Sequence, residues 1–280
     1  MGEVVLRLEG ITKNFGALKA NENVSLNLEK GEVLALLGEN GAGKTTLMNI
    51  LFGQYTADSG RVEVFGKTLP PGMASAALDA GVGMVHQHFT LAHNLSVLEN
   101  VILGTGSLWS WKVRYKQARQ QLLELANRYH LKVNPDAKVS SLSVGERQRV
   151  EILKALFRQA KILILDEPTA VLTPQETEAL FKTLKEATEQ GLSVIFISHK
   201  LREVMIIAQK VAVLRHGKIV ATKETKETSA NELAALMVGN PTSPPAVVKR
   251  KSGPVVIEFL NVSTETQHHS KGLKNVSLRL

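Results

Sequence analysis

The sequence predicts an α/β fold in which a mostly parallel sheet is flanked by helices. Short apolar runs of strand length recur along the chain and alternate with segments whose apolar residues have helical spacing. Several of these runs end in polar residues, which is typical of the carboxyl edge of an open parallel sheet. Near the N-terminus, residues 4–8 and 24–28 alternate apolar and polar residues instead, which indicates half-exposed antiparallel strands.

A glycine-rich loop joins the first predicted buried strand to the first predicted helix, within residues 31–52. The apolar run 33–37 is followed by Gly-Glu-Asn-Gly-Ala-Gly-Lys-Thr-Thr and then by apolar residues at helical spacing. This matches the phosphate-loop pattern of glycine, four residues, glycine, lysine and serine or threonine, in the strand–loop–helix context that the pattern requires. The sequence therefore predicts a P-loop nucleoside triphosphatase (NTPase) core.

The residue types of this loop suit a triphosphate and a magnesium ion. Glycines let the backbone curl until consecutive N–H groups point at one anion, and the helix N-terminus adds its positive dipole end. Lys44 supplies a compact charge for the β- and γ-phosphates, and Thr45 supplies a hydroxyl for Mg²⁺. The predicted phosphate-binding residues are Gly38, Glu39, Asn40, Gly41, Ala42, Gly43, Lys44, Thr45 and Thr46.

Three further apolar runs end in side chains that suit the same site. Residues 162–165 lead into Asp166 and Glu167, and consecutive acids at the end of a buried strand are costly unless they have a function. Asp166 is placed to hold Mg²⁺, and Glu167 can take a proton from an attacking water. Gln87 and His199 end two other runs, where Gln87 can reach Mg²⁺ and a water and His199 can contact the γ-phosphate.

Composition limits the classes of protein to consider. The 280 residues are 44% hydrophobic and 21% charged, which is ordinary for a globular protein, and the absence of cysteine excludes disulfides and thiolate metal sites. We find no secretory signal at the N-terminus and no apolar run near the ~18–20 residues of a membrane helix. The net charge of +8 fits a solvated surface, attraction to an anionic membrane or nucleic acid, in that order of preference.

Two aromatic features fit both a core and a functional role. Phe15 lies in the segment 11–23, which is turn-rich, and it either stacks on a nucleobase or fills a small core. The phosphate loop downstream favours stacking. Residues 90–111 carry Trp109 and Trp111, and their apolar side chains belong either to the core or to a partner surface.

A second predicted helix end can bind an anion. Ser143 stands at an N-cap position with Glu146 three residues later, which is the spacing of a capping box. Ser143, Val144 and Gly145 therefore form either a second anion-binding helix end or the start of a plain capped helix.

Together these segments resemble the nucleotide-binding domain of the ATP-binding cassette (ABC) transporter family. The resemblance rests on GENGAGKTT, Gln87, LSVGERQ, ILILDE and His199, in the order and spacing of that family, over residues 3–240. It implies an ATPase that uses ATP and Mg²⁺. It also implies an N-terminal antiparallel β-subdomain and a helical subdomain at about residues 88–160.

The resemblance also implies residue roles. Phe15 would stack on adenine, Gln87 would link the nucleotide site to a membrane subunit, and Glu167 would be the general base. Ser143 and Gly145, with Glu146 beside them, would face the γ-phosphate bound by an opposite domain. The residues expected to take part in catalysis are Glu167, His199, Lys44 and Gln87, and those expected around Mg²⁺ are Thr45, Gln87 and Asp166.

A closer resemblance is to the ATPase subunits of simple-sugar and nucleoside importers. It implies transmembrane permease subunits, a second cassette, an indirect extracytoplasmic substrate-binding protein and a peripheral location on the cytoplasmic face of the inner membrane, with no nucleic acid. MVHQHF and AVLTPQE are most similar to the nucleoside branch, with sugar import as the alternative. A soluble tandem cassette ATPase that acts on ribosomes or DNA is a further alternative. One departure is Thr173, which stands where the broad family usually has an aspartate.

The C-terminal residues echo the N-terminus. VVIEFLNVS and KNVSLRL repeat VVLRLEGIT and ENVSLNL with a period of about 250 residues, which indicates a second unit of the same fold. The alternative is a short C-terminal β-addition. The predicted divisions are residues 1–240 (the cassette), 241–254 (a Pro-rich linker) and 255–280 (the opening hairpin of a second cassette).

Overall fold

The computed structural model describes residues 2–87, 89–105, 115–239, 256–264 and 273–279. The chain divides into two compact units, Met1–Asn240 and Pro241–Leu280, and each is described by itself. In the described ranges, no helix has the length and apolar character needed to cross a bilayer.

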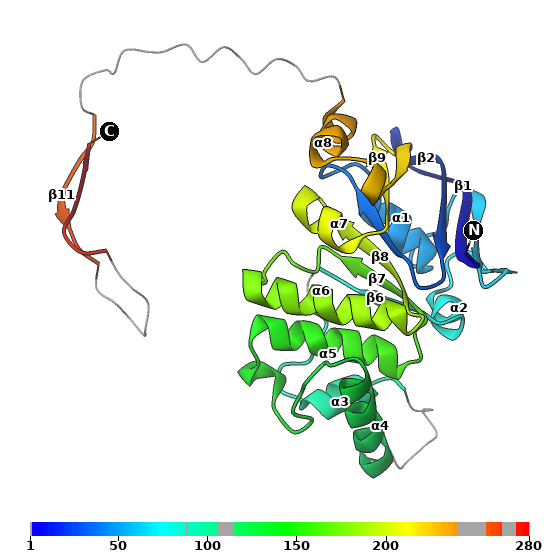
Figure 1. The fold of residues 1–280 in the computed structure, drawn as a ribbon, viewed down its shortest axis with the longest axis horizontal. Helices are drawn as coiled ribbons and strands as arrows, with labels where there is room; N and C mark the ends of the chain where they lie inside the picture. The colour runs from blue at the N-terminus through cyan, green and yellow to red at the C-terminus, as the bar shows by residue number, and fades with distance from the viewer. Residues whose placement is uncertain (1, 88, 106–114, 240–255, 265–272, 280) are drawn as a thin grey trace. The chain divides into compact units, whose positions relative to one another are not determined.

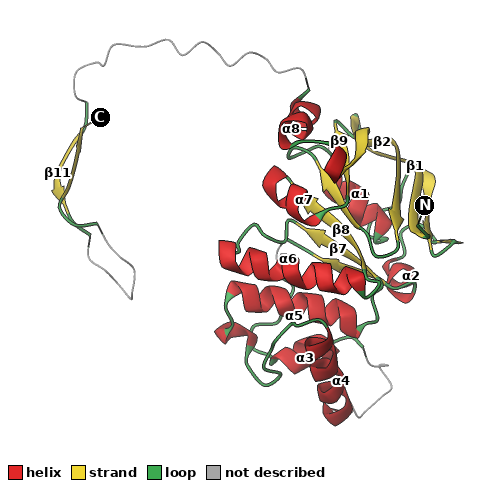
Figure 2. Ribbon diagram, viewed as in Figure 1, coloured by secondary structure: helices red, strands yellow, loops and turns green. Residues whose placement is uncertain are grey.

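A sheet that has six strands forms the centre of the first unit, and Figures 1 and 2 show where it lies. Its strand order is β10-β9-β3-β8-β7-β6, and all neighbouring strands are parallel except β9 and β10, which form a hairpin. This confirms the predicted parallel α/β core. The strands are β3 (Val33–Leu37), β6 (Val82–Val85), β7 (Ile162–Asp166), β8 (Ser193–Ser198), β9 (Lys210–Arg215) and β10 (Lys218–Glu224).

Apolar layers cover both faces of this sheet. Along β3, Val33, Ala35 and Leu37 join one buried cluster, whereas Leu34 and Leu36 join the other. Burial on both faces explains why the strands read as continuous apolar runs in the sequence. The helices that cover the two faces of the sheet are α1 (Lys44–Leu51), α2 (Ala74–Asp79), α6 (Pro174–Glu189), α7 (Leu201–Ile207) and α8 (Ala230–Val238).

A second, four-stranded antiparallel sheet packs over α1. Its order is β2-β1-β4-β5, and its apolar residues share one buried cluster with α1 and the core sheet. The prediction of a turn-rich segment at 11–23 is wrong, because both strands continue through it to a tight turn at Gly16, with bulges along the way. The strands are β1 (Val4–Phe15), β2 (Leu18–Glu29), β4 (Ser59–Val64) and β5 (Lys67–Thr68).

A helical region follows β6 and returns to β7 (Figure 1). It consists of α3 (Val97–Ile102), α4 (Tyr115–Arg128), the short 3₁₀ helix Val139–Ser141 and α5 (Val144–Phe157). Leu91 is buried and Phe89 packs against the same cluster, so these two apolar residues serve the core. Trp109 and Trp111 lie outside the described residues, and the choice between core and partner surface stays a prediction for them.

The second unit contains an antiparallel pair of strands, β11 (Glu258–Val262) and β12 (Val276–Arg279). Asn261 has a φ of 51° and Asn275 a φ of 53°, and their N–H groups donate to Ser277 Oγ (3.1 Å) and Ser263 Oγ (3.0 Å). Several apolar side chains of this pair are exposed, Leu260 among them.

In the sequence repeat, Gly10 corresponds to Asn261 and Asn23 corresponds to Asn275. The β1–β2 hairpin has the same local structure at these corresponding positions. Gly10 and Asn23 have φ values of 60° and 51°, and their N–H groups donate to Ser25 Oγ and Thr12 Oγ1, each at 3.0 Å. The two hairpins therefore share bulge positions and side-chain caps as well as sequence.

Candidate nucleotide site

A cavity of about 640 Å³ opens at the carboxyl ends of the core strands. Its walls come from the loop after β3, the ends of β7 and β8 and the segment after β6, which is the edge where open α/β sheets bind ligands. The lining residues are Phe15, Leu18, Lys19, Ala20, Asn40, Gly41, Gly43, Lys44, Thr45, Thr46, Gln87, Asp166, Glu167, His199, His216 and Gly217. The cavity thus gathers most of the side chains that the sequence predicts for a triphosphate.

The phosphate loop is shaped by close backbone approaches. Gly43 has a φ of 102° and immediately precedes α1, and a Cβ added there would lie 2.2 Å from the carbonyl oxygen of Ala20. A Cβ on Gly38 would lie 2.3 Å from the carbonyl oxygen of Leu214. Gly38, Glu39 and Ala42 belong to the loop but do not line the cavity.

We expect Gly43→Ala to disrupt nucleotide binding while the rest of the first unit stays folded. The new methyl would meet backbone at 2.2 Å in a conformation that L-residues rarely adopt, so the loop must shift. ATP affinity should fall at least tenfold, measured by equilibrium binding, with little change in far-ultraviolet circular dichroism. Gly41→Ala is the matched control, because Gly41 also has a positive φ (82°) but has no atom within 4 Å of an added Cβ. Equal losses in both variants would contradict the close-approach explanation.

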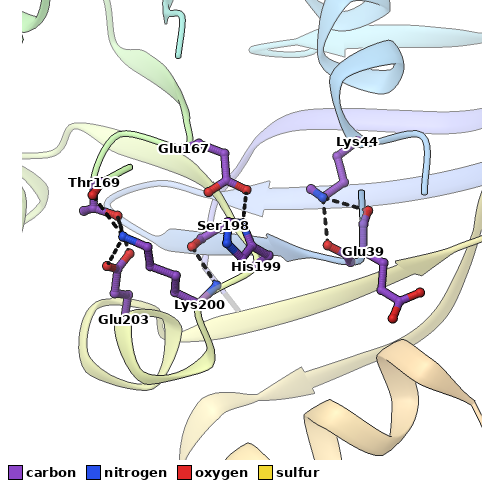
Figure 3. Close-up of polar contacts among 9 residues, drawn as sticks. Glu39, Lys44, Glu167, Thr169, Ser198, His199, Lys200 and Glu203 are labelled. Carbon is purple, nitrogen blue, oxygen red and sulfur yellow. Dashed lines mark hydrogen bonds and ion pairs between the residues drawn. The ribbon is translucent and has the colours of Figure 1, made fainter. Parts of the chain in front are cut away.

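Lys44 is buried, and its ammonium is folded over the loop. Its Nζ donates to the carbonyl oxygens of Gly38 (2.7 Å) and Glu39 (3.0 Å), as Figure 3 shows. Burial lowers the pKa of Lys44, while the charges of Glu167 and Asp166 act to raise it. The ammonium therefore lies within the electrostatic influence of both carboxylates and is held by two loop carbonyls, which phosphate oxygens can replace.

Asp166 ends β7 and lines the cavity together with Thr45 and Gln87. Burial raises the pKa of Asp166, the nearby charge of Glu167 raises it further, and His86 and Lys44 counteract this. A bound cation would favour the ionised carboxylate. Hydroxyl, amide and carboxylate oxygens together fit Mg²⁺, which keeps several ligands from water and phosphate. In the described ranges, no cluster of three or more His, Cys, Asp or Glu residues is arranged to hold a metal without a nucleotide.

Glu167 is held in a strained conformation at the centre of the site. Its φ is 47°, which is rare for a non-glycine residue, and its N–H donates to the carbonyl oxygen of Ile197 at 3.0 Å. Backbone strain of this kind costs about 1–3 kcal/mol and is often stored at functional sites. Its Oε1 lies 2.8 Å from Nδ1 of His199 (Figure 3), whereas Oε2 is buried and has no hydrogen-bond partner among the residues that the structure describes. The hydrogen-bonding capacity of that oxygen is therefore unused by the described residues.

The loop that follows Glu167 is fixed by a polar network that the sequence did not indicate. Lys200 Nζ donates to the carbonyl oxygen (2.9 Å) and the hydroxyl (3.3 Å) of Thr169, and it pairs with Glu203 at 3.1 Å. Thr169 in turn donates to Glu203 (Figure 3). These contacts join α7 to the loop after β7, so the positions of His199 and Glu167 are set together.

Phe15 forms one wall of the cavity and is not a core residue, since 45% of it is exposed. Tyr55 packs against it edge-on, with ring centroids 5.7 Å apart. Lys13 Nζ lies 5.4 Å from the ring centroid of Phe15 and donates to Asp58 at 2.9 Å, and Asp58 also accepts from the N–H of Asn14. The ring is thus supported on an exposed wall, which fits stacking against a flat base.

Gln87 is exposed at the cavity, two residues beyond the end of β6. The chain just after it is tied to the helical region, because the buried carboxylate of Glu151 on α5 accepts from the N–H (2.6 Å) and hydroxyl (3.0 Å) of Thr90. The sequence reasoning missed Glu151, although an acid in the apolar stripe of a helix is a signal that could have found it.

Ser143, Gly145 and Glu146 do not line this cavity. Ser143 Oγ accepts from the N–H of Glu146 (3.2 Å) and the Glu146 carboxylate accepts from the N–H of Ser143 (2.8 Å), so the predicted capping box is confirmed. Gly145 lies at a separate cavity of about 240 Å³ beside α6. The anion-binding role of this helix end stays a prediction.

The fold and the main cavity together define a P-loop NTPase of the cassette type, with a parallel core, an antiparallel β-sheet over the first helix and a helical insertion after β6. The chain belongs to the ABC transporter family, which it matches over residues 21–170.

Relatives of this chain are named as ATP-binding proteins of importers. It is 45% identical to the nucleoside import ATP-binding protein NupA of Lactococcus lactis subsp. cremoris, over 99% of this chain and 55% of that protein. It is 42% identical to the glucose import ATP-binding protein TsgD13 of Haloferax volcanii, over 99% of this chain and 56% of that protein. The chain thus spans just over half the length of these relatives.

Among solved structures, a nucleotide-free ATP-binding cassette from an ABC transporter matches with a TM-score of 0.76 and 28% identity. The match covers 84% of this chain and 98% of that one. The fold that the sequence predicts is therefore confirmed.

Proposed function

We propose that this chain binds and hydrolyses ATP as a cassette of an importer, and that ATP hydrolysis powers the uptake of a nucleoside. The observation that carries the proposal is the convergence of Lys44, Asp166, Glu167 and His199 on one cavity. Glu167 there has a strained backbone and one unpaired, buried oxygen. A purely regulatory nucleotide-binding module would need neither feature.

The phosphate loop would bind the phosphates by exchanging hydrogen bonds between its own residues for hydrogen bonds to phosphate oxygens. Lys44 would exchange the carbonyls of Gly38 and Glu39 for phosphate oxygens, and the N–H groups before α1 would face the same anion. The base would lie against Phe15. Thr45, Gln87 and Asp166 would hold Mg²⁺, which neutralises phosphate charge when bound.

Hydrolysis would follow from the pair formed by Glu167 and His199. The unpaired Oε2 of Glu167 can accept a proton from a water as that water attacks phosphorus, and general bases of this kind contribute about 100- to 10,000-fold. His199 Nδ1 holds Oε1 at 2.8 Å and so fixes the direction of the other oxygen. The side chain of His199 is half exposed, which leaves its ring within reach of a γ-phosphate.

A complete site would need a second cassette. Ser143 and Gly145 lie at the start of α5 and not in the nucleotide cavity, so a partner would have to supply an equivalent helix end. The shared bulges and caps of the β1–β2 and β11–β12 hairpins, with the length of the relatives, support residues 255–280 as the opening hairpin of that second cassette. In that arrangement, residues 241–254 are the linker.

The remaining partners follow from the importer class. We propose that transmembrane permease subunits hold the chain peripherally at the cytoplasmic membrane face, through the region around Gln87, and that a substrate-binding protein acts through them. Relatives are named for nucleoside import and for glucose import, so a sugar is the alternative cargo. Uptake of labelled nucleoside and of labelled sugar by the full transporter would separate the two. The relatives' names do not favour a ribosome- or DNA-directed ATPase.

The first experiment measures Mg·ATP hydrolysis over a wide range of chain concentration. We expect the rate to rise faster than linearly, because two copies would complete each other's sites. Lys44→Ala serves as the blank. A rate strictly proportional to protein concentration would contradict the requirement for two cassettes, and the absence of ATP binding would contradict the proposed function itself.

A further inference from the structure

The carboxylate of Glu176, in the first turn of α6, reaches across to the start of α5. Its Oε1 accepts from the N–H of Gly145 at 3.2 Å. Its Oε2 accepts from both the N–H and the hydroxyl of Thr173, each at 3.0 Å. One carboxylate therefore caps its own helix and also occupies an N–H group of the neighbouring helix.

The glycine at position 145 is required by this contact. A Cβ added to Gly145 would lie 2.3 Å from Oε1 of Glu176 and 2.9 Å from its Cγ. Within this chain, the absence of a side chain at 145 thus lets a carboxylate approach the helix end. Ser143 Oγ accepts from the N–H of Glu146, so at this helix end its hydroxyl acts as the capping acceptor while the Gly145 N–H is bonded to Glu176.

The carboxylate carries its full charge. Hydrogen bonds from the Thr173 backbone lower the pKa of Glu176 most, with smaller contributions from the Thr173 hydroxyl, the Gly145 N–H and the charge of Arg149. An ionised carboxylate is stabilised at a helix N-terminus by the same partial positive charge that attracts a phosphate. Two anions cannot share that N–H group without strong repulsion.

We propose that Glu176 is a positioning residue which competes with the γ-phosphate of the opposite cassette for the N–H of Gly145. The competition rests on the proposed function, in which that N–H faces the partner's nucleotide. In the single cassette Glu176 holds the helix end, and as two ATP-loaded cassettes close it gives up the N–H to the phosphate.

The structure contains a cavity and a cationic side chain that could receive the Glu176 carboxylate. Glu176 and Gly145 line the cavity of about 240 Å³ beside α6, and Arg149 lines it as well. The buried Nε of Arg149 has no hydrogen-bond partner among the described residues. A carboxylate that leaves Gly145 can therefore be received by a guanidinium one helical turn away.

The competition also connects the start of α5 with the loop that follows β7. Glu176 holds Thr173, and Thr173 ends the loop that begins at Glu167. The broad family usually places an aspartate at position 173, and here the carboxylate comes from three residues further on. Movement of Glu176 would thus couple binding of the opposite γ-phosphate to the position of the loop that carries the general base.

Glu176→Gln tests the charge without removing the cap. Glutamine is accepted at the third position of a capping box, so α6 keeps its start, but the competing negative charge is lost. Pairing would be measured by sedimentation of the full chain with Mg·ATP, in a Glu167→Gln background that prevents turnover. Glu178→Gln is the matched control, because Glu178 is exposed on the same helix.

We expect ATP-dependent pairing of the Glu176→Gln chain to tighten by about 3- to 30-fold, since the anion at a helix end is removed at each of the two sites of a pair. ATP affinity of the unpaired cassette should not change, and Glu178→Gln should behave like its parent. A merely structural role for Glu176 predicts weaker pairing together with a lower melting temperature.

Unchanged or weaker pairing would overturn the proposal, and so would the absence of pairing in every variant that binds ATP. In both cases, ATP binding of the unpaired chain is measured in the same samples. That measurement tests the proposed function separately from the competition. If the unmutated chain does not bind ATP, the proposed function and the competition fail together.

Discussion

Glu167→Gln is expected to lower ATP hydrolysis about 100- to 10,000-fold, which is the usual contribution of a general base, while ATP binding is retained. The amide keeps the size of the side chain but cannot take a proton from water. Glu167 is 9% exposed and lies at a strained φ of 47°, so its own side chain is held in one place in the site. Single-turnover hydrolysis and equilibrium ATP binding, measured on the same samples, separate the chemical step from affinity.

The variant should also accumulate as an ATP-bound pair of cassettes, because closure no longer leads to cleavage and release. Sedimentation with and without Mg·ATP measures this. Glu178→Gln is a matched control for the same chemical change at an exposed site on α6, and it should hydrolyse ATP like the parent chain. Retention of rapid turnover in Glu167→Gln would remove Glu167 from the role of base.

The contact between Glu167 and His199 adds a test of whether the two act as a unit. His199→Ala alone should lower hydrolysis, because Oε1 loses its 2.8 Å contact with Nδ1 and the other oxygen is no longer directed. In the Glu167→Gln background the same change should add little, since residues that act together are strongly non-additive. Independent, multiplying losses would show that the two side chains serve separate steps.

Much of the fold could be predicted because its signals are local. Strands β3, β7 and β8 are buried on both faces, and such strands read directly as apolar runs. The start of α5 is indicated by Ser143 with a glutamate three residues later, and the start of α6 by Pro174 in its first turn. The error at 11–23 has a physical origin as well, since bulges break the alternation of a strand and introduce the glycine and asparagine that usually mark turns.

Site residues that belong to a sequence motif were predictable, because the motif determines their geometry. Contacts between segments that are distant in the sequence were less predictable. The sequence places Lys44 at the end of the phosphate loop and Asp166 at a strand end, but it contains no signal for the left-handed backbone of Glu167. Nor does it show that Tyr55 supports Phe15, because that pair is set by packing between segments 40 residues apart. The contact of Glu176 with Gly145 is of the same kind, since each residue has a sufficient local role in its own helix.

Lys44→Ala is expected to weaken ATP binding about 10- to 100-fold, because a hydrogen bond to a charged group contributes about 1.5–3 kcal/mol and the ammonium would meet two phosphates. The change should not destabilise the chain without nucleotide. Burial lowers the pKa of Lys44, and removal of the ammonium relieves that desolvation cost but also removes its hydrogen bonds to the carbonyls of Gly38 and Glu39. Because these two effects oppose each other, the melting temperature without ATP should change little.

Thermal unfolding with increasing Mg·ATP measures both effects at once. A ligand that binds the folded state raises the melting temperature by mass action, so the parent chain should show a growing shift that Lys44→Ala lacks. Lys19→Ala is the control, since Lys19 lines the same cavity but its side chain is 63% exposed and is screened by solvent. If the two lysine variants lost the same part of the shift, the cavity would act only through its overall positive charge. A loss confined to Lys44 instead assigns binding to the ammonium that the carbonyls of Gly38 and Glu39 hold over the loop.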